Sequence, residues 1–217
     1  MYRPPHFRDD DAARLDAFVR AHPLAALVAT SQDGLTGNHL PLRLATKEAG
    51  QRFLRGHIAR ANDLWRVLPE GAPVLAIFSG ANRYITPAWY AAKATTGEVV
   101  PTWNYAVVHA HGAIRFVHDR DWLLQVVGDL TDEHERTRDS PWQVGDAPGP
   151  YVERMLSAIV GVEIAVSRIE GKFKASQNRT IDDRRRIDAG LRDEGLAANE
   201  RAELVRLEDG RNDGQPE

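Results

Sequence analysis

The sequence feature that most constrains the fold is the stretch VPTWNYAVVHAHGAIRFV, residues 99–116. From Ala106 onward, every second residue is small or apolar, at positions 106, 108, 110, 112, 114 and 116. The odd-numbered positions of the stretch carry rings, imidazoles and a cation, among them Trp103, Tyr105, His109, His111 and Arg115. Successive side chains of a β-strand point to opposite faces. The stretch therefore predicts a strand with one face in the core and a second face rich in chemistry.

Several other segments have strand character, and helices occur at intervals between them. The expected strands are residues 24–30, 38–44, 52–58, 73–80 and 159–176. Helical periodicity is expected before Pro23 and in residues 59–69, 119–135 and 151–159. Pro41 has no N–H to donate, which indicates a sheet edge, a bulge or a strand whose N–H side is unpaired. Because helices do not follow every strand, we expect a mainly β fold with some α (α+β), built on an antiparallel sheet or barrel.

Composition narrows the functional classes. The net charge of −3 disfavours broad, charge-driven binding to nucleic acid. The absence of cysteine excludes disulfides, thiolate chemistry and cysteine-bound metals. No apolar run has the length of a signal peptide or a membrane span, so we expect a cytoplasmic protein with no membrane partner. The common dinucleotide, P-loop, zinc-protease and serine-hydrolase motifs are also absent from the sequence.

The segment RGHIARAN, residues 55–62, joins the end of an expected strand to the start of an expected helix. The unpaired N–H groups and positive dipole of a helix N-terminus suit an anion. His57, Arg60 and Asn62 could add hydrogen bonds, and a guanidinium matches the geometry of a phosphate. The same residues could instead form an ordinary cap with polar surface side chains.

The ring-bearing face of residues 99–116 also has two interpretations. Its aromatic side chains could stack on a planar ligand, with Asn104 supplying a hydrogen bond. They could equally form a homodimer interface, where Trp, Tyr and Arg are enriched. A ligand in the seam of a dimer would satisfy both interpretations.

His109 and His111 lie two residues apart on the same strand face, as in some metal sites. Such a site needs a third ligand nearby. The next positions on that face, Ala113 and Arg115, are unsuitable, and a guanidinium repels a cation. We therefore expect no metal site at this pair.

The segment GKFKASQNR, residues 171–179, combines positive charge with hydrogen-bonding side chains at the end of the last expected strand. Its cations are Lys172, Lys174 and Arg179, and its polar residues are Ser176, Gln177 and Asn178. A solvated strand end explains this composition. The segment would bind a ligand only if the fold brought it near residues 55–62.

Six stretches of the chain occur in the order typical of the PaiB family, whose members are described as FMN-binding negative transcriptional regulators. They are MYRPPHF, NHLPL, GHIARAN, YITPAWY, VPTWNYAVVHAHG and GKFKASQNR. The chain resembles that family from Met1 to about Leu191. The resemblance implies a split β-barrel of the pyridoxamine-phosphate oxidase-like kind, a homodimer, and FMN in the seam between the two copies.

The resemblance also implies which residues bind FMN. The phosphate would be held by the strand end and the helix start, at His57, Ile58, Ala59, Arg60 and Asn62. The isoalloxazine or ribityl group would lie near three residues of one or the other copy, Trp103, Asn104 and Tyr105. Further polar ligands would come from Lys174, Gln177 and Asn178.

An FMN-binding negative transcriptional regulator is thus the leading hypothesis for function. DNA binding has little support in the sequence, since no helix-turn-helix pattern is visible and the arginines of DDRRRIDAGLRD are flanked by acids. The alternative is an FMN-dependent oxidoreductase or flavin reductase acting on a small molecule, with His109 and His111 carrying protons. A dimeric scaffold whose flavin site has been lost is a third possibility.

We expect three regions along the chain. Residues 1–181 would form the split-barrel domain, and residues 182–209 a helical extension. Residues 210–217 are polar and glycine-containing, which is typical of a disordered tail.

Overall fold

A computed structural model describes residues 1–47 and 50–207, which divide into two compact units. The sheet unit comprises Ala12–Phe78 and His109–Ile169. The terminal unit comprises Met1–Asp11, Ser79–Val108 and the residues from Glu170 onward. The predicted tail and the last two residues of the predicted helical extension lie outside the described residues. A separate domain ending at residue 181 stays a prediction.

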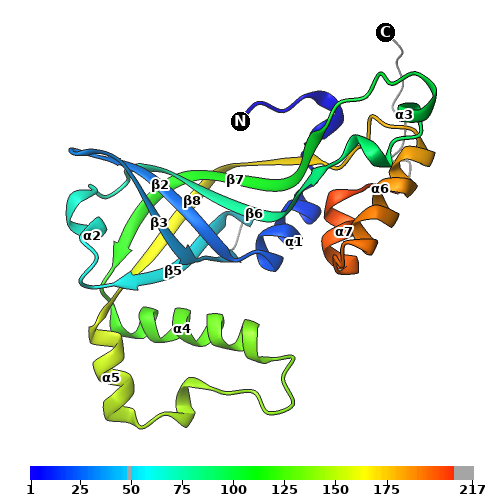
Figure 1. Cartoon of the computed structure of the whole chain (residues 1–217). Helices are drawn as coiled ribbons and strands as arrows, with labels where there is room; N and C mark the ends of the chain where they lie inside the picture. The colour runs from blue at the N-terminus through cyan, green and yellow to red at the C-terminus, as the bar shows by residue number, and fades with distance from the viewer. Residues whose placement is uncertain (48–49, 208–217) are drawn as a thin grey trace. The chain divides into compact units, whose positions relative to one another are not determined.

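The strands of the described residues form a sheet in the order β3-β2-β6-β7-β8-β5-β4, with β1 paired to β8 (Figure 1). Their bounds are β1 Arg8–Asp9, β2 Leu24–Ser31, β3 Gly34–Pro41, β4 Arg43–Thr46, β5 Arg52–Ala59, β6 Pro73–Ile85, β7 Thr102–Val117 and β8 Ile159–Lys174. β2 pairs antiparallel with β3 and β6, and β5 pairs antiparallel with β4 and β8. β6, β7 and β8 each run from one unit into the other.

Pro41 lies at a sheet edge, as predicted, but the expected strand 38–44 is divided there. β3 ends at Pro41 and β4 begins at Arg43, and the two strands occupy opposite ends of the strand order. Between them, the Leu42 N–H donates to the carbonyl of Pro23 at 2.8 Å. The missing donor of Pro41 therefore marks the point where the chain leaves one edge of the sheet for the other.

The helices are short except for α4. Their bounds are α1 Ala12–Ala21, α2 Leu64–Val67, α3 Ala92–Thr95, α4 Arg120–Glu135, α5 Gly149–Ser157, α6 Ile181–Asp193 and α7 Ala198–Leu204, with single 3-10 turns η1 Pro5–Phe7, η3 Pro87–Trp89 and η4 Val144–Asp146. Asp119 caps the N-terminus of α4, and its carboxylate accepts from the backbone N–H of Trp122 at 2.8 Å. Among the described residues, no helix combines the length and the apolarity needed to cross a membrane.

The alternation predicted for residues 99–116 is confirmed over most of β7. Ala106, Val108, Ala110 and Ile114 are all buried. The expectation fails at Phe116, which is only half-buried while the next residue, Val117, is buried. The alternation of buried and exposed residues is therefore offset by one residue at the C-terminal end of β7.

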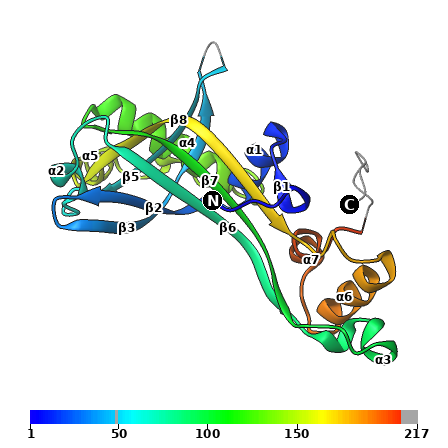
Figure 2. The ribbon, with the colours of Figure 1, turned by 90° about the horizontal axis from the view of Figure 1, so that it is seen from above.

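In the sheet unit, α4 covers one face of the sheet beside β5 (Figures 1 and 2). As a result, residues 160–164 of β8 are buried on both faces. Gly161 faces the Trp122 ring so closely that an added Cβ would lie 2.2 Å from a ring carbon. The next residue on that face, Glu163, is a buried carboxylate.

In the terminal unit, α6 and α7 pack against the end of β6 and the segment after it through an apolar cluster (Figure 2). The cluster's buried members are Ile85, Tyr90, Ile187, Leu191, Leu204 and Val205. Trp89 lies against Gly190 of α6, where an added Cβ would be 2.2 Å from the indole. The terminal unit therefore has a core of its own.

Candidate functional site

The first predicted group lies on β5 and the turn that follows it, in the sheet unit. β5 pairs with β8, so His57 lies opposite Gly161 and Ile58 opposite Val160. Ile58 is buried in the core, and Ala59 is exposed at the strand end. The helix after them is shorter than predicted, because α2 has a single turn beginning at Leu64. A helix of this length offers an anion only a small dipole.

Arg60 has a structural role at the end of α5. Its Nε donates to the Ser157 carbonyl at 2.6 Å, and its Nη2 donates to the Ile159 carbonyl at 2.9 Å. The backbone N–H of Arg60 also donates to the Ala158 carbonyl at 2.8 Å. These contacts satisfy carbonyls that have no partner within the helix. A guanidinium has five N–H donors, so a phosphate contact remains compatible with this arrangement.

Both polar atoms of the Asn62 side chain are used within the fold. Its Nδ2 donates to the Asn38 Oδ1 at 2.8 Å, and its Oδ1 accepts from the Leu64 N–H at 3.0 Å. Asn62 therefore holds the turn against β3 and starts α2. Nδ2 carries a second N–H, so an anion could engage the Asn62 amide without displacing either of these hydrogen bonds.

His57 is the member of this group with an unsatisfied polar atom. Its Nδ1 is buried and has no hydrogen-bond partner among the described residues. Burial lowers the pKa of the imidazole from its ordinary value, which keeps it neutral at pH 7. A neutral imidazole can donate through one ring nitrogen and accept through the other.

The second predicted group lies on β7 in the terminal unit, and its members have different surroundings. Trp103 is 52% exposed, and its indole N–H donates to the Asn82 Oδ1 at 3.3 Å. Asn104 is fully buried, and its Nδ2 donates to the Ser176 Oγ at 2.8 Å and to the Leu204 carbonyl at 2.9 Å. Asn104 thus joins β7 to the C-terminal helices through Nδ2, while its buried Oδ1 has no hydrogen-bond partner among the described residues.

The third predicted group lies beside the second, in the same unit. The Lys174 ammonium donates to the Trp103 carbonyl at 2.8 Å and also to the Thr102 hydroxyl. Gln177 is used locally, because its Oε1 accepts from the Ala175 N–H at 2.8 Å. Asn178 is exposed. The structure therefore brings Lys174 to Trp103, whereas Gln177 shapes the turn after β8.

Two cations that the predicted site omitted, Lys172 and Arg179, complete this cluster. The Lys172 ammonium lies 5.4 Å from the centroids of both the Tyr2 and Tyr105 rings. The Arg179 guanidinium lies 4.7 Å from the Tyr90 ring centroid. Lys172 could have been predicted from its spacing, because residues two apart on a strand share a face and Lys174 was already predicted. Arg179 follows a turn, and its position had no such signal.

The cation cluster, defined as Lys172, Lys174 and Arg179, is electrostatically uncompensated. No carboxylate of the described residues lies within ion-pair distance of these three side chains. Burial lowers the pKa of Lys174, and the positive charges of Lys172 and Arg179 lower it further. An anion bound here would reverse part of that shift.

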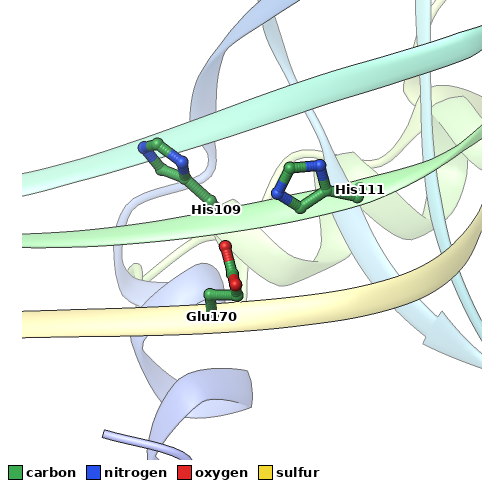
Figure 3. Close-up of side chains that lie close together, drawn as sticks. All are labelled: His109, His111 and Glu170. Carbon is green, nitrogen blue, oxygen red and sulfur yellow. The ribbon is translucent and has the colours of Figure 1, made fainter. Parts of the chain in front are cut away.

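His109 and His111 lie on β7 within the sheet unit, as Figure 3 shows. Their ring centroids are 6.4 Å apart, and both side chains are half-buried. Glu170, which is drawn in the same figure, belongs to the terminal unit. The two imidazoles are thus neighbours on the polar face of the strand, as the alternation predicted.

These donors match the chemistry of FMN. A phosphate needs cations with free N–H groups, and the cation cluster supplies them. An isoalloxazine needs flat apolar walls, and Trp103 and Tyr105 present exposed or half-exposed rings next to those cations. The cluster is therefore chemically suited to a ligand that carries a phosphate and a flat ring system.

Comparisons with known proteins identify the family. Residues 1–168 match the family described as "Putative FMN-binding domain". The protease synthase and sporulation protein PAI 2 of Bacillus subtilis is 32% identical over 206 residues, which cover 94% of this chain and 96% of that protein. An uncharacterized protein of Emericella nidulans is 33% identical over 219 residues, covering 85% of this chain and 87% of its own. The chain therefore belongs to this FMN-binding family, and the predicted resemblance to PaiB is confirmed.

Solved structures share the fold at low sequence identity. The FAD and heme binding protein of Mycobacterium smegmatis superposes with a TM-score of 0.56 at 16% identity, over 76% of this chain and 72% of that one. The flavocytochrome Anf3 of Azotobacter vinelandii gives a TM-score of 0.56 at 14% identity, over 79% of this chain and 71% of that one. The predicted α+β split-barrel class is confirmed, and the family match supports FMN as the cofactor.

Proposed function

We propose that this protein binds FMN as a cytoplasmic homodimer and acts as a flavin-dependent negative transcriptional regulator. The observation that carries the proposal is the uncompensated cation cluster beside the exposed ring of Trp103 in a member of an FMN-binding family. When bound, FMN supplies a group that can accept and donate electrons. A regulator could use that property to sense small molecules or redox state.

Different residues would contact different parts of FMN. Lys172, Lys174 and Arg179 of the terminal unit offer positive charge to the phosphate. Arg60, in the sheet unit, is a second and separate candidate for that contact. Trp103 and Tyr105 supply the ring surfaces. Asn104, Asn62 and Gln177 would hold these groups in position, because their own side-chain contacts lie within the fold. His57, Ile58 and Ala59 would shape the strand end next to Arg60, and the exposed Asn178 would be a further polar ligand.

The same surface supports the proposal of a homodimer. Val100, Tyr84 and Trp103 are exposed by 65%, 48% and 52%, and Tyr84 packs edge-on against Trp103 with centroids 6.2 Å apart. Exposed aromatic side chains of this kind are enriched where a second copy binds. We propose that a second copy covers these side chains and that the flavin lies in the seam.

An FMN titration followed by absorbance and flavin fluorescence tests the cofactor site. Lys174→Ala should weaken FMN binding by about 1–3 kcal/mol, the range for losing a charge-assisted contact. Lys93→Ala, which removes an exposed lysine of the same unit, should leave the affinity unchanged. Equal affinities for the wild type and Lys174→Ala would remove the cation cluster from the site.

Arg60→Ala tests the other predicted phosphate ligand. It should weaken FMN binding by a similar amount, about 1–3 kcal/mol. Arg60 also hydrogen-bonds the C-terminal end of α5, so the melting temperature of Arg60→Ala must be compared with that of a control variant. Arg20→Ala is that control, because Arg20 is an exposed arginine of the same unit. A variant that melts like the control and binds FMN like the wild type would confine Arg60 to its structural role.

An FMN-dependent oxidoreductase or flavin reductase is the second candidate. The neighbouring imidazoles of His109 and His111 favour it, since imidazole is the side chain best suited to move protons near neutral pH. Steady oxidation of NAD(P)H in the presence of FMN and an acceptor would establish an enzyme. Its absence with several acceptors, together with saturable FMN binding, would favour the regulator.

A further inference from the structure

The sheet unit contains an apolar cavity of about 310 Å³ between α4, α5 and the segment that joins them. Figure 1 shows this segment running from the end of α4 back to α5. The principal lining residues are Trp142, Val144, Tyr151, Val152, Met155 and Leu156. A cavity of this size falls within the range of sites for small molecules.

The apolar lining is open to solvent. Trp142, Tyr151 and Met155 are exposed by 45%, 47% and 44% although each is large and apolar. Tyr151 and Met155 lie four residues apart on α5, which is the spacing of a helix face that packs on a core. Here that face borders the cavity instead. The fold thus presents an organised apolar surface that no described residue covers.

One polar group lies at the inner wall. His57 borders this cavity and also an adjoining hollow of about 340 Å³, which shares Val127 and Trp142 with it. The His57 Nδ1 is buried and unpartnered among the described residues, and burial keeps the imidazole neutral. Leaving such an atom unpaired has a cost in free energy, which a ligand hydrogen bond would remove.

The charge of the lining disfavours an anionic occupant. Among the described residues, no lysine or arginine lines either hollow. Arg154 lies over the Tyr151 ring at 5.5 Å and donates to the Pro150 carbonyl, so it borders the rim. Glu135, the carboxylate in the adjoining hollow, accepts from Arg138 and from the Trp142 N–H.

We propose that this cavity binds a small uncharged molecule with a flat apolar ring and one N–H or O–H group. The ring lies between Trp142, Tyr151 and Met155, and the polar group hydrogen-bonds to His57. The inference does not depend on the flavin, because it uses only the geometry and charge of the sheet unit.

N-phenyl-1-naphthylamine, a neutral fluorescent molecule with one N–H, is a suitable probe. Its fluorescence should rise saturably on addition of the full-length protein, with one site per chain. Met155→Glu, which places a charge in the lining, should weaken binding at least tenfold. Leu24→Glu changes an apolar residue that is 62% exposed outside the cavity and should leave binding within twofold of the wild type. Tyr151→Asp gives a second test if Met155→Glu does not fold.

The affinities of two matched probes test the hydrogen bond to His57. The N-methyl derivative of the probe lacks the N–H and should bind the wild type about threefold to tenfold more weakly, as expected for one hydrogen bond. In His57→Phe the two probes should bind equally. A preference that survives in His57→Phe would remove His57 from the site.

Three results would overturn the proposal. One is non-saturable fluorescence, or equal loss of binding in Met155→Glu and Leu24→Glu. Another is competitive displacement of the probe by FMN, which would assign the cavity to the cofactor. The third is conversion of a dimer to a monomer by Met155→Glu in sedimentation, which would assign the surface to a second copy of the chain.

Discussion

Replacing Glu163 by glutamine should destabilise the protein strongly, because this carboxylate joins three cations inside the sheet unit. The Glu163 side chain is 2% exposed. It accepts from Arg55 Nε at 2.7 Å and from Arg115 Nε at 2.8 Å, and the Lys47 ammonium lies 3.4 Å away. Glutamine keeps the shape of the side chain but removes its charge.

The magnitude follows from the exposure of the three cations. Removing one partner of a buried ion pair costs about 3–5 kcal/mol when the other charge stays buried. Arg55 is 15% exposed and would lose its partner in a poorly hydrated position. Arg115 and Lys47 are 46% and 44% exposed and can be rehydrated. We therefore expect a loss of about 2–3 kcal/mol, just below the range for a fully buried pair.

Urea denaturation followed by circular dichroism measures this loss. Glu153→Gln is the matched control, because Glu153 makes an ion pair with Arg120 in which both side chains are about half exposed. Its denaturation midpoint should stay close to that of the wild type. A Glu163→Gln midpoint equal to that of Glu153→Gln would refute the reasoning.

The same network predicts a pH dependence. Burial alone would raise the pKa of Glu163, but the hydrogen bonds from Arg115 and Arg55 outweigh it and hold the pKa below the ordinary value. A folded-state pKa below the unfolded one gives stability that is complete above the unfolded pKa, about 4.3 for Glu. That stability is lost as the pH falls through the lowered value. The acid loss of stability should therefore be shallower in Glu163→Gln than in the wild type.

Two further substitutions test the packing of each unit. Gly161→Ala should cost about 1–3 kcal/mol in thermal or urea unfolding, because its Cβ would overlap the Trp122 ring; a stability equal to the wild type would show that the indole can move aside. Asn104→Ala should cost about 1–3 kcal/mol, because it removes the donor to Ser176 and Leu204 from a buried position; amide exchange in α7 that stays as slow as in the wild type would contradict the role of Asn104 in joining β7 to that helix.

The sequence predicted the parts of the fold that depend on periodicity. The two-residue period of β7 identified Ala106, Val108, Ala110 and Ile114 as buried. It failed at Phe116, because at the C-terminal end of the strand the buried position is Val117 instead. Periodicity also overestimated the helix after β5. Only Leu64–Val67 is α-helical, because the Asn62 Oδ1 holds the preceding turn through the Leu64 N–H and Pro69 follows at the other end.

The candidate sites were less predictable, because they depend on contacts between distant segments. Arg60 carried the expected charge, but its carbonyl partners lie about a hundred residues later in the chain. Tyr151 and Met155 have the spacing of a buried helix face, and no local pattern shows that this face borders a cavity. The importance of Glu163 was also hidden, since its cations come from three other segments.

Native mass spectrometry of the full-length protein mixed with FMN tests the central claim most directly. Each chain has a mass of 24.2 kDa. The proposed function predicts a species of two chains carrying two FMN molecules, and Lys174→Ala should lower the population of this species at limiting FMN. A monomer that retains no FMN at any concentration tested would contradict the account.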